Sequence, residues 1–213
     1  MMRTLLLFVF CLLLCHVTAV DNSAAQTTDL LISEYVEGSG NNKALEIYNG
    51  TEDTINLGGY TIERFSNGTA IATSINLLAV DLGPDQTFVI CNPGASAALL
   101  AKAAQTNANI NFNGNDALVL ALGGSTIIDS FGRVGEDPGS FWSCPDGTTA
   151  NSTLRRLSSI CEGDTDSSDA FDPCLQWSFE ATDYFVALGS HISDCGAVAT
   201  ETSSWGTMKS LFR

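Results

Sequence analysis

SEYVEGSGNNKALEIYNGT, residues 33–51, is the stretch that decides the fold. Two short runs, residues 30–36 and 44–48, lie on either side of the polar loop at 38–42. Glycine and asparagine in that loop tolerate positive φ and form hydrogen bonds with their own backbone, so the loop ends one extended run and starts the next. The stretch therefore predicts two neighbouring strands, and Asn49-Gly50 after the second run is a hairpin signal.

Two glutamates in this stretch raise the question of catalysis. Strict alternation places Ser33 and Tyr35 on one face of the first strand, and Ile32 and Glu34 on the other. Glu34 and Glu46 could then face one another across the two strands, as paired carboxylates do in glycosidases. In a half-buried sheet, however, the polar side chains point to water. We therefore expect both glutamates at the surface, without a catalytic role.

The same alternation of short apolar runs and turn residues continues along the chain. Further strands are expected at 60–65 and 87–91, and a hairpin is expected from 116–122 and 126–131 about Gly123-Gly124. One alanine-rich segment, 95–105, predicts a short helix that starts after Asn92-Pro93. Trp142 and Trp177 are candidate core residues. The pattern is typical of an all-β, immunoglobulin-like β-sandwich with one short helix.

The N-terminus has the layout of a secretory signal peptide. Arg3 precedes the apolar run Leu5–Leu14, and Val17-Thr18-Ala19 offers a cleavage site. The run is shorter than the ~20 residues that a membrane-spanning helix needs. We expect a signal peptide at 1–19, one domain at 20–195 and a flexible tail at 196–213, in a protein that is secreted and has no membrane span.

The charge of the chain argues against nucleic-acid binding. The formal net charge is −15, with 24 acidic and 9 basic residues. Phosphate binding needs clustered Lys and Arg, and the one basic pair is Arg155-Arg156. We expect that pair on an exposed strand, partnered by neighbouring carboxylates.

Most enzyme classes lack their essential residues. After removal of the signal peptide, His191 is the one histidine, and there is no Gly-x-Ser-x-Gly turn for a serine hydrolase. One histidine cannot supply a metal cluster of the usual kind. We therefore expect no catalytic residue, no cofactor and no metal site, and a structural hydrogen bond for His191.

The acidic segment CEGDTDSSDAFDP leaves one metal alternative open. Asp164, Asp166, Asp169 and Asp172 offer the oxygen ligands that Ca²⁺ prefers, but they lack the glycine and closing glutamate of an EF-hand loop. A solvated loop that uses aspartate in its turns is the favoured interpretation.

Five cysteines remain after signal removal. In a secreted protein we expect Cys144, Cys161, Cys174 and Cys195 to form two disulfides. Four cysteines allow three pairings; proximity in the chain favours Cys144 with Cys161 and Cys174 with Cys195. Cys91, in the apolar run TFVIC, is expected to be a buried free thiol.

Three sequons stand at predicted turns. They are Asn49-Gly50-Thr51, Asn67-Gly68-Thr69 and Asn151-Ser152-Thr153. An asparagine at a turn is accessible to a glycosyltransferase, so we expect glycosylation at Asn49, Asn67 and Asn151 if the source is eukaryotic.

The ordered motifs of the chain resemble the lamin tail domain in its secreted form. The matching stretches are LLISEYVEGSGNNKALEIYNGT, INLGGYTI, LGPDQTFVICNP, FNGNDALVLALGGSTIIDSFGRVGEDPG, STLRR and FDPCLQW…DYFVALGSH. The resemblance implies an immunoglobulin-like sandwich and a non-catalytic interaction domain. The expected partner is an extracellular protein or glycan, or a further copy of the chain. The alternatives are an accessory module of an extracellular nuclease or phosphatase, and a calcium- or carbohydrate-dependent binding protein.

Overall fold

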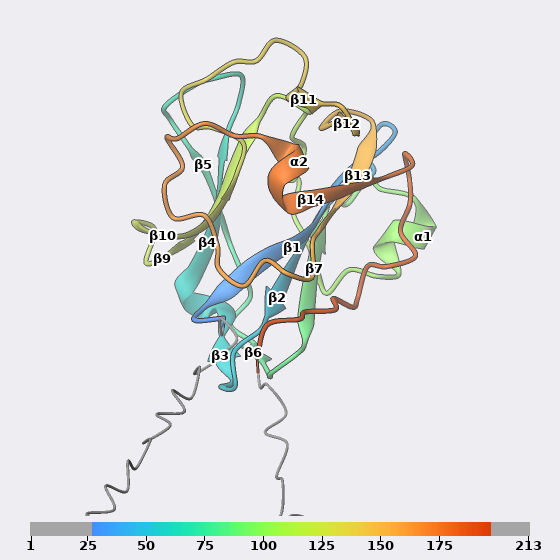
Figure 1. Cartoon of the computed structure of the whole chain (residues 1–213). Coiled ribbons are helices and arrows are strands. Elements are labelled where there is room, and N and C mark those ends of the chain that lie inside the picture. The colour runs from blue at the N-terminus through green and yellow to red at the C-terminus, as the bar shows by residue number, and fades with distance from the viewer. Residues whose placement is uncertain (1–26, 197–213) are drawn as a thin grey trace, which may run out of the picture.

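Two β-sheets pack face to face in the computed structural model, which describes residues 27–196 (Figure 1). The predicted all-β, immunoglobulin-like sandwich is confirmed. The predicted signal peptide at 1–19 and residues 197–213 of the predicted tail lie outside the described part. Within residues 27–196, no helix is long and apolar enough to cross a membrane.

The strands are short and almost all antiparallel; β7 and β8 run parallel. The larger sheet has, in spatial order, β14 (Trp177–Glu180), β13 (Ser152–Arg156), β1 (Leu30–Glu37), β2 (Lys43–Asn49), β7 (Thr87–Cys91) and β8 (Gln105–Thr106). The smaller sheet has β10 (Thr126–Phe131), β9 (Ala117–Leu122), β4 (Tyr60–Phe65) and β5 (Thr73–Asn76). Two further pairs are β3 (Ile55–Asn56) with β6 (Asp81–Leu82), and β11 (Ser143–Cys144) with β12 (Gly147–Thr148). The helical segments are η1 (Leu57–Gly59), α1 (Ala97–Leu100) and α2 (Pro173–Gln176).

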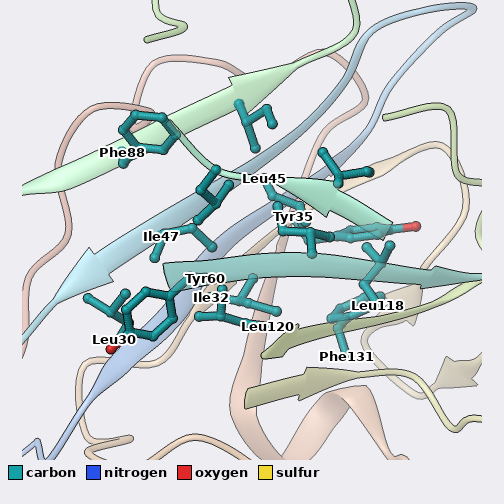
Figure 2. Packing of buried hydrophobic residues seen from close by; sticks show 14 of the residues in the cluster. Leu30, Ile32, Tyr35, Leu45, Ile47, Tyr60, Phe88, Leu118, Leu120 and Phe131 are labelled. Atoms are coloured by element: carbon teal, nitrogen blue, oxygen red, sulfur yellow. The ribbon is translucent and has the colours of Figure 1, made fainter. Parts of the chain in front are cut away.

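The core lies between the two sheets (Figure 2). Tyr35 is fully buried at its centre, where its ring stacks on Phe131 with 4.0 Å between the ring centroids. Phe131 also meets Trp177 edge-on at 5.1 Å. Trp142 and Trp177 are both buried, so the prediction that they are core residues is confirmed.

A β-bulge in β1 changes which residues face the core. The register between β1 and β2 shifts between Ile32 and Glu34. The extra residue reverses the alternation beyond it, so Ile32 and Tyr35 both pack in the core. The predicted faces of β1, which assumed strict alternation, are therefore wrong for Ile32 and Tyr35.

Both faces of β1 and β2 are covered, which the sequence did not indicate. Every residue of the two strands is buried. One face meets the core, and the other meets a second apolar cluster that joins the sheet to α1 and the C-terminal segment. In Figure 1 that segment runs from β14 past α1 to the end of the molecule that holds β3 and β6.

Two local predictions need correction. The helix α1 has four residues rather than the predicted 95–105, because Ser96 caps it and the chain then extends to pair β8 with β7. Asn49-Gly50 ends β2, but the chain leaves the sheet there, since β3 pairs with β6. The predicted hairpin about Gly123-Gly124 is confirmed, with both glycines at positive φ.

Candidate functional site

The candidate site is a pair of buried carboxylates on the larger sheet. Glu34 on β1 and Glu46 on β2 are direct cross-strand partners, and each residue is 1% exposed. The two glutamates therefore do face one another, which the sequence left open as a possibility. Their predicted exposure is wrong, because the C-terminal segment covers this face of the sheet.

Glu46 has well-defined hydrogen-bond donors. Ser33 Oγ donates to Glu46 Oε1 at 2.8 Å, and the backbone N–H of Gly189 donates to Glu46 Oε2 at 2.6 Å. Gly189 lies 143 residues further along the chain. This bond therefore ties the C-terminal segment directly to the centre of the larger sheet.

Glu34 has fewer partners. Arg155 Nε on β13 lies 3.6 Å from Glu34 Oε2. Glu34 Oε1 is buried and has no hydrogen-bond partner among the described residues. An unpartnered carboxylate oxygen is costly to bury in its charged form, and a protonated carboxyl group avoids most of that cost.

The environment favours the protonated form of both acids. Burial, followed by the Glu46 carboxylate, raises the pKa of Glu34 to about 8, although Arg155 opposes the change. Burial also raises the pKa of Glu46, against the bonds from Gly189 and Ser33. At neutral pH the pair therefore holds a proton. Strongly shifted acids are candidates for function, but structural clusters show them too.

Residues 184–194, which we call the strap, cover this pair. Besides the Gly189 bond, Lys102 Nζ donates to the carbonyl oxygen of Leu188 at 2.8 Å, and Leu188 packs in the second apolar cluster. His191 packs edge-on against Tyr48, with 4.8 Å between ring centroids. Burial, aided by Arg155 and Arg156, lowers the pKa of His191 to about 4. Its Nε2 has no partner within residues 27–196, so the hydrogen bond predicted for His191 is not formed at that atom.

Four of the cavities on residues 27–196 have volumes of about 210–310 Å³, and neither Glu34 nor Glu46 lines any of these four. One of them, of about 250 Å³, is lined by Arg155 and by His191 of the strap. Arg155 also lies 3.6 Å from Glu34, so a residue that contacts the pair reaches this cavity.

A second charged cluster lies at the edge of the core, and sequence reasoning missed it. Asp129 on β10 and Arg156 on β13 form an ion pair in which both side chains are fully buried. The guanidinium also donates to the Ile32 carbonyl oxygen and lies 4.3 Å from the centroid of the Trp177 ring. The prediction of an exposed Arg155-Arg156 pair is therefore wrong for Arg156. The available signal was the lone aspartate in the apolar strand TIIDSF.

The acidic loop does not gather its carboxylates around one point. Asp164 and Asp166 close local turns, in which they accept from the N–H groups of Asp166 at 3.0 Å and Ser168 at 3.1 Å. Asp169 lines a cavity of about 210 Å³ together with Asp164 and Asp172. Within residues 27–196, three potential ligand atoms converge at Cys144, Asp172 and Cys174, where the two sulfurs form a disulfide. Asp172 itself caps α2 by accepting a hydrogen bond from the Cys174 N–H. The geometry favours the solvated-loop interpretation.

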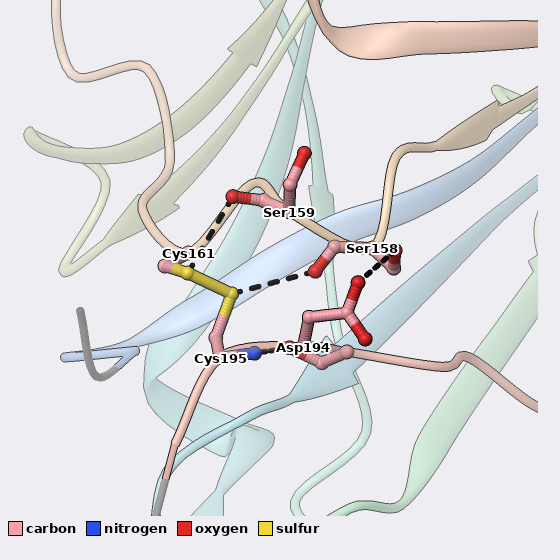
Figure 3. Close-up of a disulfide and its surroundings, with 6 residues drawn as sticks. Ser158, Ser159, Cys161, Asp194 and Cys195 are labelled. Atoms are coloured by element: carbon pink, nitrogen blue, oxygen red, sulfur yellow. Dashed lines mark hydrogen bonds between the residues drawn. A yellow bond between two sulfur atoms is a disulfide. The ribbon is translucent and has the colours of Figure 1, made fainter. Parts of the chain in front are cut away.

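Among residues 27–196, four cysteines form two disulfides, and Cys91 is a buried free thiol. The bonds join Cys144 to Cys174 and Cys161 to Cys195, so the predicted pairing is wrong. Chain proximity misled the prediction because the β11–β12 hairpin packs beside α2, whereas the end of the strap returns to the residues that follow β13. Figure 3 shows the second bond, with Asp194 beside Ser158.

Removal of the Cys161–Cys195 bond is expected to be costly. Its closed loop spans 34 residues, and that of Cys144–Cys174 spans 30, so the chain-entropy model gives about 3–4 kcal/mol for each. We expect the Cys161→Ser/Cys195→Ser variant to lose about that much free energy of unfolding in urea titrations. Non-reducing peptide mapping checks the pairing itself; a Cys144–Cys161 peptide would contradict it.

The three sequon asparagines differ in exposure. Asn67 and Asn151 are exposed and adopt positive φ in turns. Asn49 is fully buried, and its Nδ2 donates to the carbonyl oxygens of Asp53 and Leu82, both at 2.8 Å. The predicted accessibility is therefore wrong for Asn49, whose side chain ties β2 to the β3–β6 end of the fold.

We expect glycan mapping after expression in a glycosylating host to find Asn67 and Asn151 modified and Asn49 unmodified. A glycan on Asn49 Nδ2 would replace one of its two donating hydrogens, and the fully buried nitrogen leaves no room for the sugar. Asn49→Ala should therefore lower the free energy of unfolding by about 2 kcal/mol, because both buried hydrogen bonds are lost. Asn151→Gly, which removes the exposed side chain and still adopts positive φ, should change it by less than about 0.5 kcal/mol. Equal losses in the two variants would contradict this assignment.

Comparison with known protein families gives one match. The family model described as Lamin Tail Domain matches residues 23–135, more than half of the chain. No match to the chain was found among curated proteins. The matched part extends through β10. The strands β13 and β14, both disulfides and the strap lie beyond it.

Proposed function

This chain belongs to the lamin tail domain family, a family of non-catalytic immunoglobulin-like domains, and on that premise we propose that it is a secreted interaction domain without catalytic activity. The observation that carries the proposal is the covered carboxylate pair. Its two acids are the groups best suited to acid–base chemistry, yet each is 1% exposed. A general acid must reach the proton acceptor on its substrate within hydrogen-bond distance.

Two features support an extracellular location. The chain has two disulfides. Disulfides persist in oxidising compartments and are rare in the cytosol. The first 19 residues have the layout of a signal peptide. The proposed partner is an extracellular protein or glycan, or a second copy of the chain. The net charge of −15 favours a partner with basic groups and disfavours nucleic acid.

A pull-down from the native extracellular medium tests this proposal. The mature chain, residues 20–213, is immobilised, and the same chain after reduction and thiol alkylation serves as the control. We expect the disulfide-bonded chain alone to retain a protein or glycan that then binds the purified chain saturably. Equal retention by both preparations, or no saturable binding, would contradict the proposal.

The same eluate separates the alternatives. Nuclease or phosphatase activity in the retained fraction would favour an accessory module of a separately encoded hydrolase. Retention that a chelator abolishes would favour calcium-dependent binding, despite the dispersed carboxylates of the 164–172 loop. Both outcomes would replace the leading proposal.

A further inference from the structure

The strap is fixed at both ends and is held in the middle by hydrogen bonds with Glu46 and Lys102. At its start, the Asp183 carboxylate accepts from the Ser39 N–H at 2.9 Å and from Asn42 Nδ2 at 2.9 Å. At its end, the Asp194 N–H donates to the Ser158 carbonyl oxygen at 2.8 Å, next to the Cys161–Cys195 disulfide (Figure 3). Between these ends, the Gly189 N–H donates to Glu46.

We propose that residues 184–194 lift from the larger sheet when the buried Glu34–Glu46 pair loses its proton, while the Cys161–Cys195 disulfide keeps the strap attached. In the closed form, two cross-strand carboxylates share a dry surface, and Glu34 Oε1 has no partner in the described part of the chain. Two anions there repel one another and lack water. Lifting the strap admits water to the pair, because the strap lies directly on Glu46 through the Gly189 N–H.

Other charged groups around the pair do not offset its second negative charge. The charged or titratable groups near the pair are Arg155 on β13, Glu180 on β14, Lys102 after α1, Tyr48 on β2, Cys91 on β7 and His191 on the strap. Arg155 is the nearest cation, yet at 3.6 Å it forms no hydrogen bond with Glu34. His191, with its pKa lowered to about 4, stays neutral above pH 5. Burial raises the pKa of the Cys91 thiol above its ordinary value. Glu34 is therefore the group that changes charge as the pH approaches 8.

The sign of the pH effect follows from proton linkage. The closed form holds Glu34 with a pKa of about 8, whereas a hydrated glutamate has the ordinary value of 4.5. Between these values the closed form binds more protons, so opening becomes more favourable as the pH rises. The opening constant should increase about tenfold per pH unit from pH 5 to pH 8 and level off above pH 8. Opening exposes Val36, Ala44 and Val89 of the second apolar cluster.

This strap lies outside residues 23–135, so the proposal goes beyond what family membership implies. Amide hydrogen exchange of the full mature chain tests it. The exchange rates of the strap amides are measured in the wild type and in Glu34→Gln, and the first rate is divided by the second. The amide of Gly189 is the main reporter. The ratio removes the intrinsic pH dependence of exchange, and glutamine reproduces the shape of the protonated acid.

We expect a ratio of about 4 at pH 5 that rises to about 1,000 at pH 8, as the pKa values of 4.5 and about 8 require. Glu63→Gln, a strand glutamate of the smaller sheet, should behave as wild type. If the strap opens by itself, the exchange rates of its amides should not change at low urea concentrations. The amides of β9 exchange on global unfolding, so their rates should rise with urea. Equal rates in wild type and Glu34→Gln at pH 8, or strap exchange with the same urea dependence as β9, would overturn the proposal.

The disulfide supplies a second test. In Cys161→Ser/Cys195→Ser, the strap loses its covalent end, so its amides should exchange faster at every pH. The pH dependence should remain, because Glu34 and Glu46 are unchanged. Loss of the pH dependence in this variant would contradict the role assigned to the carboxylate pair.

Discussion

Asp129→Ala is expected to lower the free energy of unfolding by about 3–5 kcal/mol, since removal of one partner leaves a buried charge uncompensated. The Asp129 carboxylate is fully buried and accepts hydrogen bonds from the N–H groups of Ile32, Ser130 and Asp164, at 2.8–2.9 Å. Without it, the buried Arg156 guanidinium loses its counter-ion, and three backbone donors lose their acceptor. Urea unfolding at pH 7 measures the loss.

An exposed ion pair provides the matched control. Arg133 and Glu136 form an ion pair whose side chains are 43% and 40% exposed. Glu136→Ala should cost less than about 1 kcal/mol, because surface ion pairs are hydrated and contribute little. A double variant, Asp129→Leu with Arg156→Met, should recover only the part of the loss that comes from the unpaired charge, since the three backbone N–H groups still lack an acceptor. A loss in Asp129→Ala no larger than in Glu136→Ala would contradict the structural role of this cluster.

Glu34→Gln is expected to stabilise the protein at alkaline pH, by up to about 4 kcal/mol at pH 8.5. The folded pKa of Glu34 is raised from 4.5 to about 8, so the folded state binds more protons than the unfolded state between these values. Wild-type stability therefore falls as the pH rises through this window, and glutamine, which cannot ionise, avoids the fall. Opening of the strap would relieve part of the cost in wild type.

The same variant should have little effect at pH 4.5 and almost none below it, where Glu34 becomes protonated in the unfolded state as well as in the folded state. Unfolding curves at pH 4.5, 6.5 and 8.5 therefore measure the trend. A loss of stability in Glu34→Gln at pH 8.5 would contradict the account, because it would show that the ionised carboxylate stabilises the fold through Arg155.

The sequence predicts the sandwich well because the signals for its strands are local. The Gly123-Gly124 hairpin and the loop at 38–42 follow from residues that tolerate positive φ, and neither needs information from elsewhere in the chain. The helix α1 is the opposite case. Its alanine-rich sequence favours a longer helix, but the pairing of β8 with β7, a tertiary contact, ends it early.

The candidate site is less predictable because it depends on what covers the outer face of the sheet. Alternation in β1 and β2 indicates that one face is polar, and the usual consequence is exposure to water. Gly189 lies 143 residues from Glu46, and no periodicity relates the two positions. The predicted disulfide pairing is wrong for the same reason. The strap returns Cys195 to a position beside Cys161, although the two residues are 34 positions apart in the sequence.

An activity assay on the secreted, disulfide-bonded chain tests the central claim most directly: that the covered Glu34–Glu46 pair is structural and that this domain does not catalyse a reaction. The substrates are DNA, RNA, phosphate esters and common polysaccharides, with Glu34→Gln and Glu46→Gln assayed beside the wild type. The account predicts no turnover in any of the three proteins. Turnover by the wild type that either glutamine variant abolishes, while keeping its β-sheet circular dichroism, would contradict it.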